Sequence, residues 1–365
     1  MDTKILAIYL PQYYPFPEND EWWGKGFTEW TNVGNAKPLF RGHYQPKVPS
    51  ELGYYDLRLP IVREQQAELA KYAGIHGFCY WHYWFGNGKR LMWEVFDEVL
   101  KSGSPNFPFC LGWANHSWYA KNWNSGSTKG ADKLLIEQQY LGEKDYRMHF
   151  DYVIQAFRDQ RYVQIDGKPV FMIYDAHALP SDFIPLWNKW AKESGFEQGI
   201  YFIANIYYNE DENKYLQMGY SAVTKSRLRS YYKQNLIQNI WGHLRSWVRN
   251  KVFRQFENIP DYKDVYPYLI DKTDDAKECV IPTLVPNFDH SPRSGKNGLI
   301  YNNCTPELFK EHVKQAMDVV KNKKNKVILL KSWNEWGEGN YVEPDLRYGR
   351  GWLNAIRDVV KENNK

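Results

Sequence analysis

The sequence contains little cysteine, and the cysteines form no group. Cys79, Cys110, Cys279 and Cys304 are scattered along 365 residues. Cys79 and Cys110 lie within apolar runs and Cys279 directly precedes one, and in such places a free cysteine behaves as a small buried hydrophobic residue. Their spacing fits neither a disulfide framework nor a metal site. We therefore expect a reduced protein that needs no metal and no cofactor.

Long apolar runs and a strong charge of one sign are also missing. No run approaches the 18 apolar residues of a membrane-spanning helix, and the N-terminal run 5–10 is too short for a signal peptide. The net charge of +4 is small for this length and does not point to nucleic acid. We expect a cytoplasmic protein with no nucleic-acid partner.

Aromatic residues, by contrast, are abundant. The chain has 16 tryptophans and 28 tyrosines, which is more than a core requires, so many rings must line a cavity or lie at the surface. Rings with a flat apolar face and a polar edge suit a sugar, which has a C–H face and a rim of hydroxyls. The composition therefore favours a glycan as the binding partner.

Short apolar runs alternate with segments of helical periodicity. Eight runs are apolar throughout, as expected of parallel strands covered on both faces. The runs span residues 5–10, 77–81, 109–113, 170–174, 201–205, 222–224, 280–285 and 327–332. The helical patterns lie at 59–72, 91–101, 146–158, 181–194 and 305–321. With no internal repeat and no Gly/Ser linker, this order predicts a single (β/α)8 TIM barrel over residues 1–365.

Two regions interrupt the alternation. Residues 12–60 form a long connection rich in Trp, Tyr, Pro and Gly, and long loops in compact domains are usually functional. Residues 225–254 hold eight Lys or Arg and no acidic residue, within an insertion predicted at about 225–275. This stretch predicts either a basic helix packed on the barrel by its apolar face, which we favour, or a peripheral contact with an anionic membrane.

Two glutamates follow the last predicted strand. Glu335 and Glu338 are three residues apart, directly after an apolar run, and Trp333 and Trp336 flank them. Active sites of TIM barrels lie at the C-terminal ends of the strands. Paired carboxyl groups at such a position can protonate a leaving oxygen and act as base or nucleophile in glycoside chemistry. We therefore predict Glu335 and Glu338 as the catalytic pair.

The other strand ends, and the long loop after the first strand, also deliver polar groups mixed with rings. This coincidence is harder to explain by structure alone than any single residue would be. We predict that the substrate contacts come from these residues: Tyr13, Trp23, Glu29, Trp30, His82, Trp84, Trp113, Asn115, Tyr174, Asp175, Asn205, Asp289, Arg293, Trp333, Asn334 and Trp336.

Several of these residues have a structural alternative. Asp175 can cap the loop that follows it, and His82 and Trp113 can belong to the barrel packing. Arg293 either pairs with Asp289 or reaches an anionic group of the substrate. Glu29 is a third carboxylate near the rim and a rival to both glutamates of the last strand.

Motifs from the first strand to the last resemble one known family. The chain resembles WbsX-type proteins of bacterial surface-polysaccharide loci, a group also described as glycoside hydrolase family 99-like. The motifs that carry the resemblance lie at 9–15, 19–24, 26–30, 42–46, 52–56, 113–115 and 333–339.

The resemblance implies a barrel-shaped, configuration-retaining endo-α-mannosidase-like enzyme. Matched on the Asn-Glu-Trp-x-Glu pattern, Glu335 would deprotonate the sugar 2-hydroxyl and Glu338 would be the general acid, with a 1,2-anhydro sugar between the two steps. Glu338 must then hold a proton, so we expect burial and the charge of Glu335 to raise its pKa. His116 stands where the family suggests Glu, and the basic insertion has no counterpart.

Three functions follow from these observations. We predict a glycoside hydrolase-like enzyme acting on an α-linked glycan, such as a mannose-containing or bacterial surface polysaccharide. The first alternative is a glycosyltransferase of surface-polysaccharide biosynthesis, since WbsX-type proteins often carry that label. A nucleotide-sugar transferase should show a doubly wound fold, which this pattern does not predict. The second alternative is a glycan-binding protein without catalysis.

Overall fold

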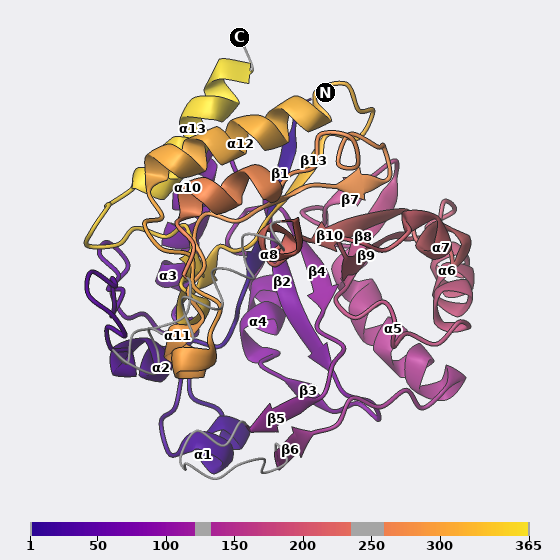
Figure 1. Cartoon of the computed structure of the whole chain (residues 1–365). Coiled ribbons are helices and arrows are strands. Elements are labelled where there is room, and N and C mark those ends of the chain that lie inside the picture. Colours follow the sequence, from indigo (N-terminus) through magenta and orange to yellow (C-terminus); the bar gives the residue numbers. More distant parts are fainter. Residues whose placement is uncertain (1, 121–132, 235–258, 364–365) are drawn as a thin grey trace.

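The computed structural model describes residues 2–120, 133–234 and 259–363. Parallel strands form the centre of the molecule, and helices surround them (Figure 1). The strands follow the order β10-β9-β8-β4-β2-β1-β13, and every neighbouring pair in this order is parallel. Their bounds are β1 Lys4–Tyr9, β2 Gly77–Trp84, β4 Phe109–Trp113, β8 Lys168–Ile173, β9 Tyr201–Tyr207, β10 Ala222–Ser226 and β13 Val327–Leu330.

The predicted strand 280–285 closes the barrel in two pieces. β11 (Val280–Ile281) pairs with β10, and β12 (Thr283–Leu284) pairs with β13. Pro282 lies between them and has no N–H to donate to a neighbouring strand. One chain segment thus joins the two edges of the sheet. The predicted (β/α)8 barrel is confirmed, with all eight predicted strands in place.

Side chains alternate between the inside of the barrel and the helix layer. Phe171 of β8 packs outward against Trp187 of α6 (Phe183–Glu193), with 5.0 Å between the ring centroids. Its neighbour Met172 and residue Asn205 of β9 face the interior cavity. This alternation follows from the period of two in a strand, and it fixes which residues reach the mouth of the barrel.

Helices follow most strands and cover the outside. Their bounds are α3 Pro60–Ala73, α4 Glu94–Ser102, α5 Glu143–Phe157, α7 Glu212–Gln217, α12 Pro306–Val320 and α13 Gly351–Asn363. Thr305 caps α12, since its hydroxyl accepts from the Leu308 N–H at 3.4 Å. The predicted helix 91–101 starts later, because Arg90–Leu91 forms β3 and pairs with the end of β2. The C-terminal helix α13 was not predicted.

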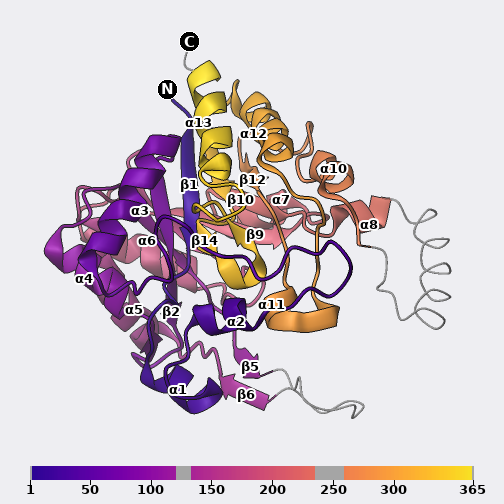
Figure 2. The ribbon, with the colours of Figure 1, turned by 90° about the vertical axis from the view of Figure 1, so that its left-hand side faces the viewer.

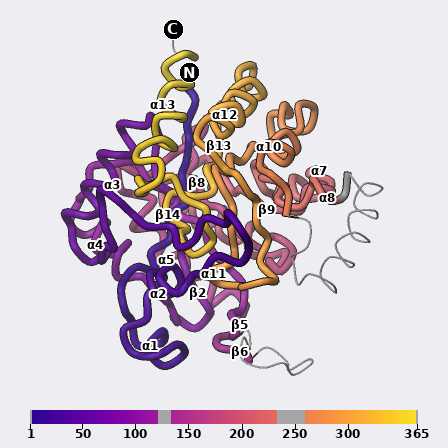
Figure 3. Tube along the Cα trace, turned by 60° about the vertical axis from the view of Figure 1, so that its left-hand side comes forward, coloured from indigo at the N-terminus to yellow at the C-terminus, as the bar shows by residue number. Residues whose placement is uncertain are grey.

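The short elements collect at the C-terminal ends of the strands. α1 (Pro17–Trp23), α2 (Glu29–Asn35), α11 (Ser291–Ser294), β5 (Trp118–Ala120) and β6 (Lys133–Ile136) lie at this end, opposite the two ends of the chain (Figure 2). Figure 3 likewise shows α2 beside α11, although more than 250 residues separate them. The remaining short elements are β7 (Gln164–Ile165), α8 (Ser230–Gln234), α10 (Tyr262–Val265), η1 (Tyr266–Tyr268) and η2 (Gly295–Asn297).

The described part of the predicted basic insertion is tied into the protein. Lys225 is buried and pairs with Glu212 at 2.9 Å and with Asp274 at 2.8 Å. Arg227 is also buried and pairs with Asp274 and Asp275. These two cations are therefore engaged inside the protein, and the predicted contact of the stretch 225–254 with a membrane stays a prediction. Residues 235–258 of the predicted insertion lie outside the described residues.

No helix among the described residues combines the length and the apolar character that a membrane crossing requires.

Candidate active site

A tight hairpin carries the predicted catalytic glutamates. β14 (Asn334–Glu335) pairs with β15 (Asn340–Tyr341), and the turn η3 (Trp336–Glu338) lies between them. The Asn334 side chain accepts from the Leu10 N–H at 2.8 Å and donates to the Leu10 carbonyl at 3.0 Å. Because these bonds fix the hairpin to the end of the first strand, the two glutamates hold a defined place at the barrel mouth.

Arg293 of α11 connects three carboxylates. Its Nε donates to Glu29 Oε1 at 2.8 Å, its Nη1 to Glu338 Oε1 at 2.8 Å and its Nη2 to Glu335 Oε2 at 3.0 Å. The five N–H donors of a guanidinium lie in one plane, which lets a single side chain bond several acceptors in this way. The structure thus brings together four of the predicted site residues from three separate loops.

Glu29 reaches this cluster because residue 337 is glycine. A Cβ on Gly337 would lie 1.6 Å from Glu29 Oε1, which is far inside any allowed contact. Glu29 is 1% exposed, so it cannot move aside into solvent. The turn Trp336–Glu338 therefore leaves room for the side chain of Glu29, the first residue of α2.

Lys331 is a second cation in the cluster. It directly follows β13, and its ammonium donates to Glu338 Oε2 at 3.2 Å. His290 Nε2 lies 3.8 Å from Glu338 Oε1. Glu338 therefore faces Lys331, Arg293 and His290, whereas among the described residues the one ion pair of Glu335 is with the shared Arg293. The two glutamates have unequal surroundings.

This difference sets the two pKa values in opposite directions. Burial and the charge of Glu338 raise the pKa of Glu335. Burial also opposes ionisation of Glu338, but Lys331 and Arg293 outweigh it and lower the pKa of Glu338. The expectation that Glu338 has a raised pKa is therefore wrong, because that prediction overlooked Lys331. In this structure the proton of the pair belongs on Glu335.

Tyrosine rings stand beside the carboxylates. Burial raises the pKa of Tyr83 well above its ordinary value, and the charge of Glu335 adds to the shift. The pKa of Tyr174 is also raised, mainly by burial, and Glu338 contributes. Trp81 supports Tyr174 edge-on, with 5.5 Å between the ring centroids. Tyr83 is buried and Tyr174 is 39% exposed, so of these two rings only Tyr174 is open to solvent.

Asp289 does not pair with Arg293, and that alternative is corrected. Its Oδ2 accepts from Gln45 Nε2 at 2.6 Å and lies 2.8 Å from His43 Nε2. Although burial opposes ionisation, the hydrogen bond to His43 and the charge of Lys47 lower the pKa of Asp289 to about 2. The Asp289 N–H donates to the Glu338 carbonyl at 2.7 Å. Asp289 therefore connects the first loop to the β14–β15 hairpin.

Trp333 and Trp336 are packing residues in this structure, contrary to the predicted substrate contact. Trp333 is fully buried against Phe78, with 5.1 Å between the centroids. Trp336 is 1% exposed and stacks on Tyr341 at 3.6 Å. Its indole N–H donates to Glu343 at 2.6 Å. The indoles hold the hairpin in place and do not form the wall of the site.

A buried carboxylate, Glu343, lies beneath the hairpin. It accepts hydrogen bonds from Trp336 Nε1, from the Tyr55 hydroxyl at 2.8 Å and from Gln66 Nε2 at 2.7 Å. Burial raises its pKa to about 7, although these donors act in the opposite direction. Tyr13 is also buried, and its hydroxyl bonds the Asn334 carbonyl. Glu343 and Tyr13 therefore support the hairpin from inside the protein.

Three further candidates form a closed cluster in the barrel wall. His82 Nε2 lies 2.8 Å from His149 Nε2, and Trp84 stacks on His149 at 4.7 Å. Trp113 donates its indole N–H to the Trp84 carbonyl at 3.0 Å. All are less than a tenth exposed, and burial lowers the pKa of His82 to about 3. His82 and Trp113 are therefore packing residues of the barrel, as the structural alternative in the sequence analysis had it. Trp84 is a packing residue as well.

The remaining candidates divide between buried supports and open surface. Asn115 is buried, and its amide donates to the Asp175 carbonyl at 2.8 Å, while Asp175 accepts from two N–H groups of its own loop. Trp30 is half-buried and donates to the Tyr55 carbonyl at 2.8 Å. Trp23 is exposed on α1. Asn205 faces the interior cavity and donates to the Tyr174 carbonyl at 2.9 Å.

Sequence reasoning missed Lys331, Tyr83 and Glu343. Lys331 had a usable signal, since it is the one charged residue in the predicted strand 327–332, and a buried charge needs a partner. Tyr83 and Glu343 had none, because nothing in their neighbourhood sets them apart from the many other tyrosines and acidic residues. Among the described residues, no group of His, Cys, Asp and Glu has the arrangement of a metal site.

The sequence profile of the family described as Glycosyltransferase WbsX matches residues 5–356. The chain belongs to this family. Two curated relatives are the proteins called Uncharacterized protein WxcX in two strains of Xanthomonas campestris pv. campestris. Each is 32% identical over 372 residues, which cover 99% of this chain and 50% of the relative. The chain thus spans about half the length of the curated relatives it matches.

Solved structures share the fold of this WbsX family member at low sequence identity. The GH99 endo-α-mannosidase from Bacteroides thetaiotaomicron is 15% identical, with a TM-score of 0.57 over 100% of this chain and 98% of that one. A protein described as glycoside hydrolase-like is 15% identical, with a TM-score of 0.62 over 98% and 94% of the two chains. The chain therefore has the same barrel fold as these two proteins.

Proposed function

We propose that this WbsX family member is a glycoside hydrolase that cleaves an α-linked polysaccharide or oligosaccharide, with Glu335 and Glu338 as the catalytic pair. The main support for this proposal is the charged cluster at the barrel mouth. Arg293 forms ion pairs with both glutamates and with Glu29, whereas Lys331 forms an ion pair with Glu338 and not with Glu335. Two neighbouring carboxyl groups with pKa values displaced in opposite directions are the arrangement that acid–base catalysis uses.

The proposed reaction runs in two steps. Glu335 removes the proton from the sugar 2-hydroxyl, and that oxygen attacks the anomeric carbon. The bond to the leaving oxygen breaks as Glu338 gives that oxygen a proton. Water then opens the 1,2-anhydro sugar, with its proton going to Glu338 and the proton of Glu335 returning to the 2-oxygen. Overall the anomeric configuration is retained.

These roles require a proton shift when the substrate binds. In the free protein Glu335 has the raised pKa and Glu338 the lowered one. Substrate hydroxyls that take the place of Lys331 or Arg293 at Glu338 would weaken the stabilisation of its charge and raise its pKa. The shared proton then passes from Glu335 to Glu338. Substrate binding therefore prepares the acid.

Defined α-linked glycans, including α-mannosides and bacterial surface oligosaccharides, test this function. We expect the wild type to release reducing ends with retained configuration, observed by proton NMR. Glu335→Gln and Glu338→Gln should each lower the rate by roughly 100-fold or more, since general acid–base catalysis contributes about that much. Glycan binding without turnover by the wild type would indicate a binding protein and contradict the proposal.

A glycosyltransferase is the second candidate, favoured by the family description and by the ionised state of Glu338. A carboxylate held in its charged form can accept the proton of an acceptor hydroxyl. The same glycans, offered together with sugar nucleotides, distinguish the two. Sugar transfer that depends on the nucleotide and occurs without hydrolysis would replace our first proposal with this one.

A further inference from the structure

Two tyrosines continue the inward-facing side of neighbouring strands. In β8, Met172 faces the barrel interior, and Tyr174 follows two residues later. In β9, Asn205 faces the interior, and Tyr207 follows two residues later. Because side chains in a strand alternate, both tyrosines stand over the mouth of the barrel and not under the helix layer.

The register places Tyr207 farther out than Tyr174. Ile173 pairs with Ala204, so Tyr174 is level with Asn205, and the bond between them agrees with this. Tyr207 lies two residues beyond that level, which is roughly 7 Å along the strand. The two rings therefore form a rising path from the carboxylates to the rim.

Both rings are open to solvent on one face, although another ring packs against each of them on the other side. Tyr174 is 39% exposed and Tyr207 is 65% exposed. His116 backs Tyr174 with 4.9 Å between the ring centroids, and His177 backs Tyr207 with 5.6 Å. Rings that are held on one side and open on the other suit the C–H face of a sugar.

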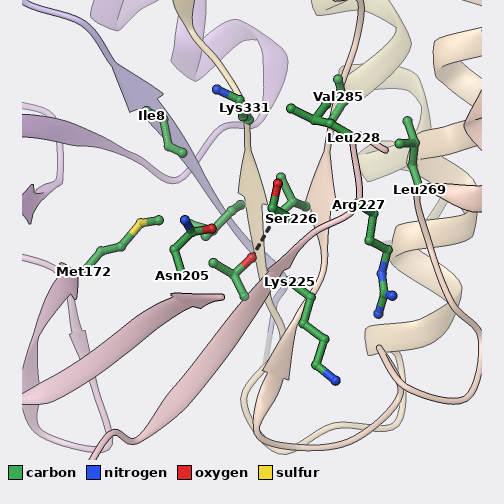
Figure 4. A pocket seen from close by; sticks show the side chains of 13 residues that line it. Ile8, Met172, Asn205, Lys225, Ser226, Arg227, Leu228, Leu269, Val285 and Lys331 are labelled. Atoms are coloured by element: carbon green, nitrogen blue, oxygen red, sulfur yellow. Dashed lines mark hydrogen bonds between the residues drawn. The ribbon is translucent and has the colours of Figure 1, made fainter. Parts of the chain in front are cut away.

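A cavity lies beside this path. Asn205, Ser226 and Lys331 are among its lining residues. Figure 4 shows the charged ends of Lys225 and Arg227 pointing away from the space between Asn205 and Ser226. Ser226 pairs with Tyr207 in the strand register, so an amide and a hydroxyl stand next to the outer ring. Such groups bind sugar hydroxyls.

We propose that Tyr174, Asn205, Tyr207 and Ser226 form an extended subsite for further sugars of the glycan. The glycan would extend from the catalytic pair across the ends of β8, β9 and β10. Tyr207 stacks against the sugar farthest from Glu338, and Asn205 and Ser226 bond hydroxyls between the two rings. This inference rests on the proposed function. It makes the substrate an oligosaccharide or polysaccharide of at least three sugars.

The length dependence of binding tests this subsite. Catalytically inactive Glu338→Gln protein is titrated by calorimetry with size-fractionated α-mannose oligosaccharides and bacterial surface oligosaccharides of two to five sugars. We expect affinity to rise from two to three sugars or more in this background. Adding Tyr207→Ala should weaken binding of the longer chains roughly three- to tenfold and leave the shortest chains unchanged.

Tyr72→Ala serves as the matched control, since Tyr72 is an exposed tyrosine on the outer helix α3. It should leave the length dependence intact. Longer chains that bind equally well with and without Tyr207 overturn the subsite while leaving the proposed function standing. Failure of every glycan to bind Glu338→Gln and to be cleaved by the wild type overturns the proposed function and the subsite with it.

Discussion

At the scale of single residues, Lys331 makes the largest contribution to lowering the pKa of Glu338 in the proposed catalytic pair. It is half-buried, it directly follows an apolar strand, and its ammonium donates to Glu338. The charges of Glu338 and Glu335 raise the pKa of Lys331 against the effect of burial, so it remains a cation. One charged side chain at the end of an apolar strand thus reverses the protonation expected for two glutamates.

We expect Lys331→Met to raise the pKa of Glu338 by about one to three units, because an opposite charge within a few ångströms lowers a carboxyl pKa by that amount. Carbon-13 NMR of protein labelled at glutamate carboxyls measures the titration directly. Lys331→Arg keeps the positive charge and should keep the pKa low. An unchanged titration of Glu338 in Lys331→Met would contradict the role given to Lys331.

Gly337 is the second residue on which the cluster depends. We expect Gly337→Ala to destabilise the protein by about 1–3 kcal/mol and to abolish turnover, because its Cβ would displace Glu29 and break the Arg293 bridge. Gly34→Ala is the control, since that position in α2 has open space around it. Chemical denaturation and the glycan assay give the two readouts. Equal behaviour of the two variants would show that Glu29 is not held as described.

At the scale of elements, the hairpin β14–β15 depends on a buried carboxyl. Trp336 stacks on Tyr341 and donates to Glu343, so the position of the turn Trp336–Glu338 depends on a group that can lose a proton. The pKa of Glu343 is raised to about 7 from an ordinary value of 4.5. The folded protein therefore holds this proton over a pH range in which the unfolded chain has released it.

The consequence is a pH-dependent stability. A raised folded-state pKa gives stability that is complete below pH 4.5 and is lost as the pH rises to about 7, by up to about 3 kcal/mol. Glu343→Gln should lack this contribution, so its unfolding free energy should vary less than that of the wild type over the same range. Urea denaturation at several pH values measures the difference. Parallel curves for the two proteins would exclude Glu343 as the source.

At the scale of the whole molecule, an ion-pair network ties the sixth strand to the chain that follows it. Lys225 and Arg227 at the end of β10 bond Glu212 of α7 and the acidic residues Asp274 and Asp275. Lys277 adds a further cation to Glu212 and Asp274. The network holds together segments far apart in the sequence, at the side of the barrel that borders the proposed subsite.

We expect Glu212→Gln to destabilise the protein at pH 7 by up to about 3 kcal/mol. Burial acts against ionisation of Glu212, but Lys277 and Lys225 lower its pKa to about 2. A lowered folded-state pKa gives stability that is present above pH 4.5 and lost as the pH falls to about 2. The wild type and the variant should therefore converge in acid. A constant difference down to pH 2 would contradict this assignment.

Much of the architecture follows from the sequence alone. Eight apolar runs separated by helical patterns were enough to predict a parallel barrel, because only strands covered on both faces are apolar throughout. The pair Glu335 and Glu338 could be placed at the mouth for the same reason, since it follows the last run. The local hydrophobic pattern and the known geometry of barrels are enough to predict the fold and the position of these two glutamates.

Other properties were decided only by the tertiary structure. Which rings are buried, as Trp333 and Trp336 are, depends on neighbours brought from other strands. The protonation of the glutamates depends on Arg293 and Lys331, which lie 45 and 7 residues from Glu338 in the chain. Electrostatic energy falls with distance in space and not along the chain, so no local pattern can specify it.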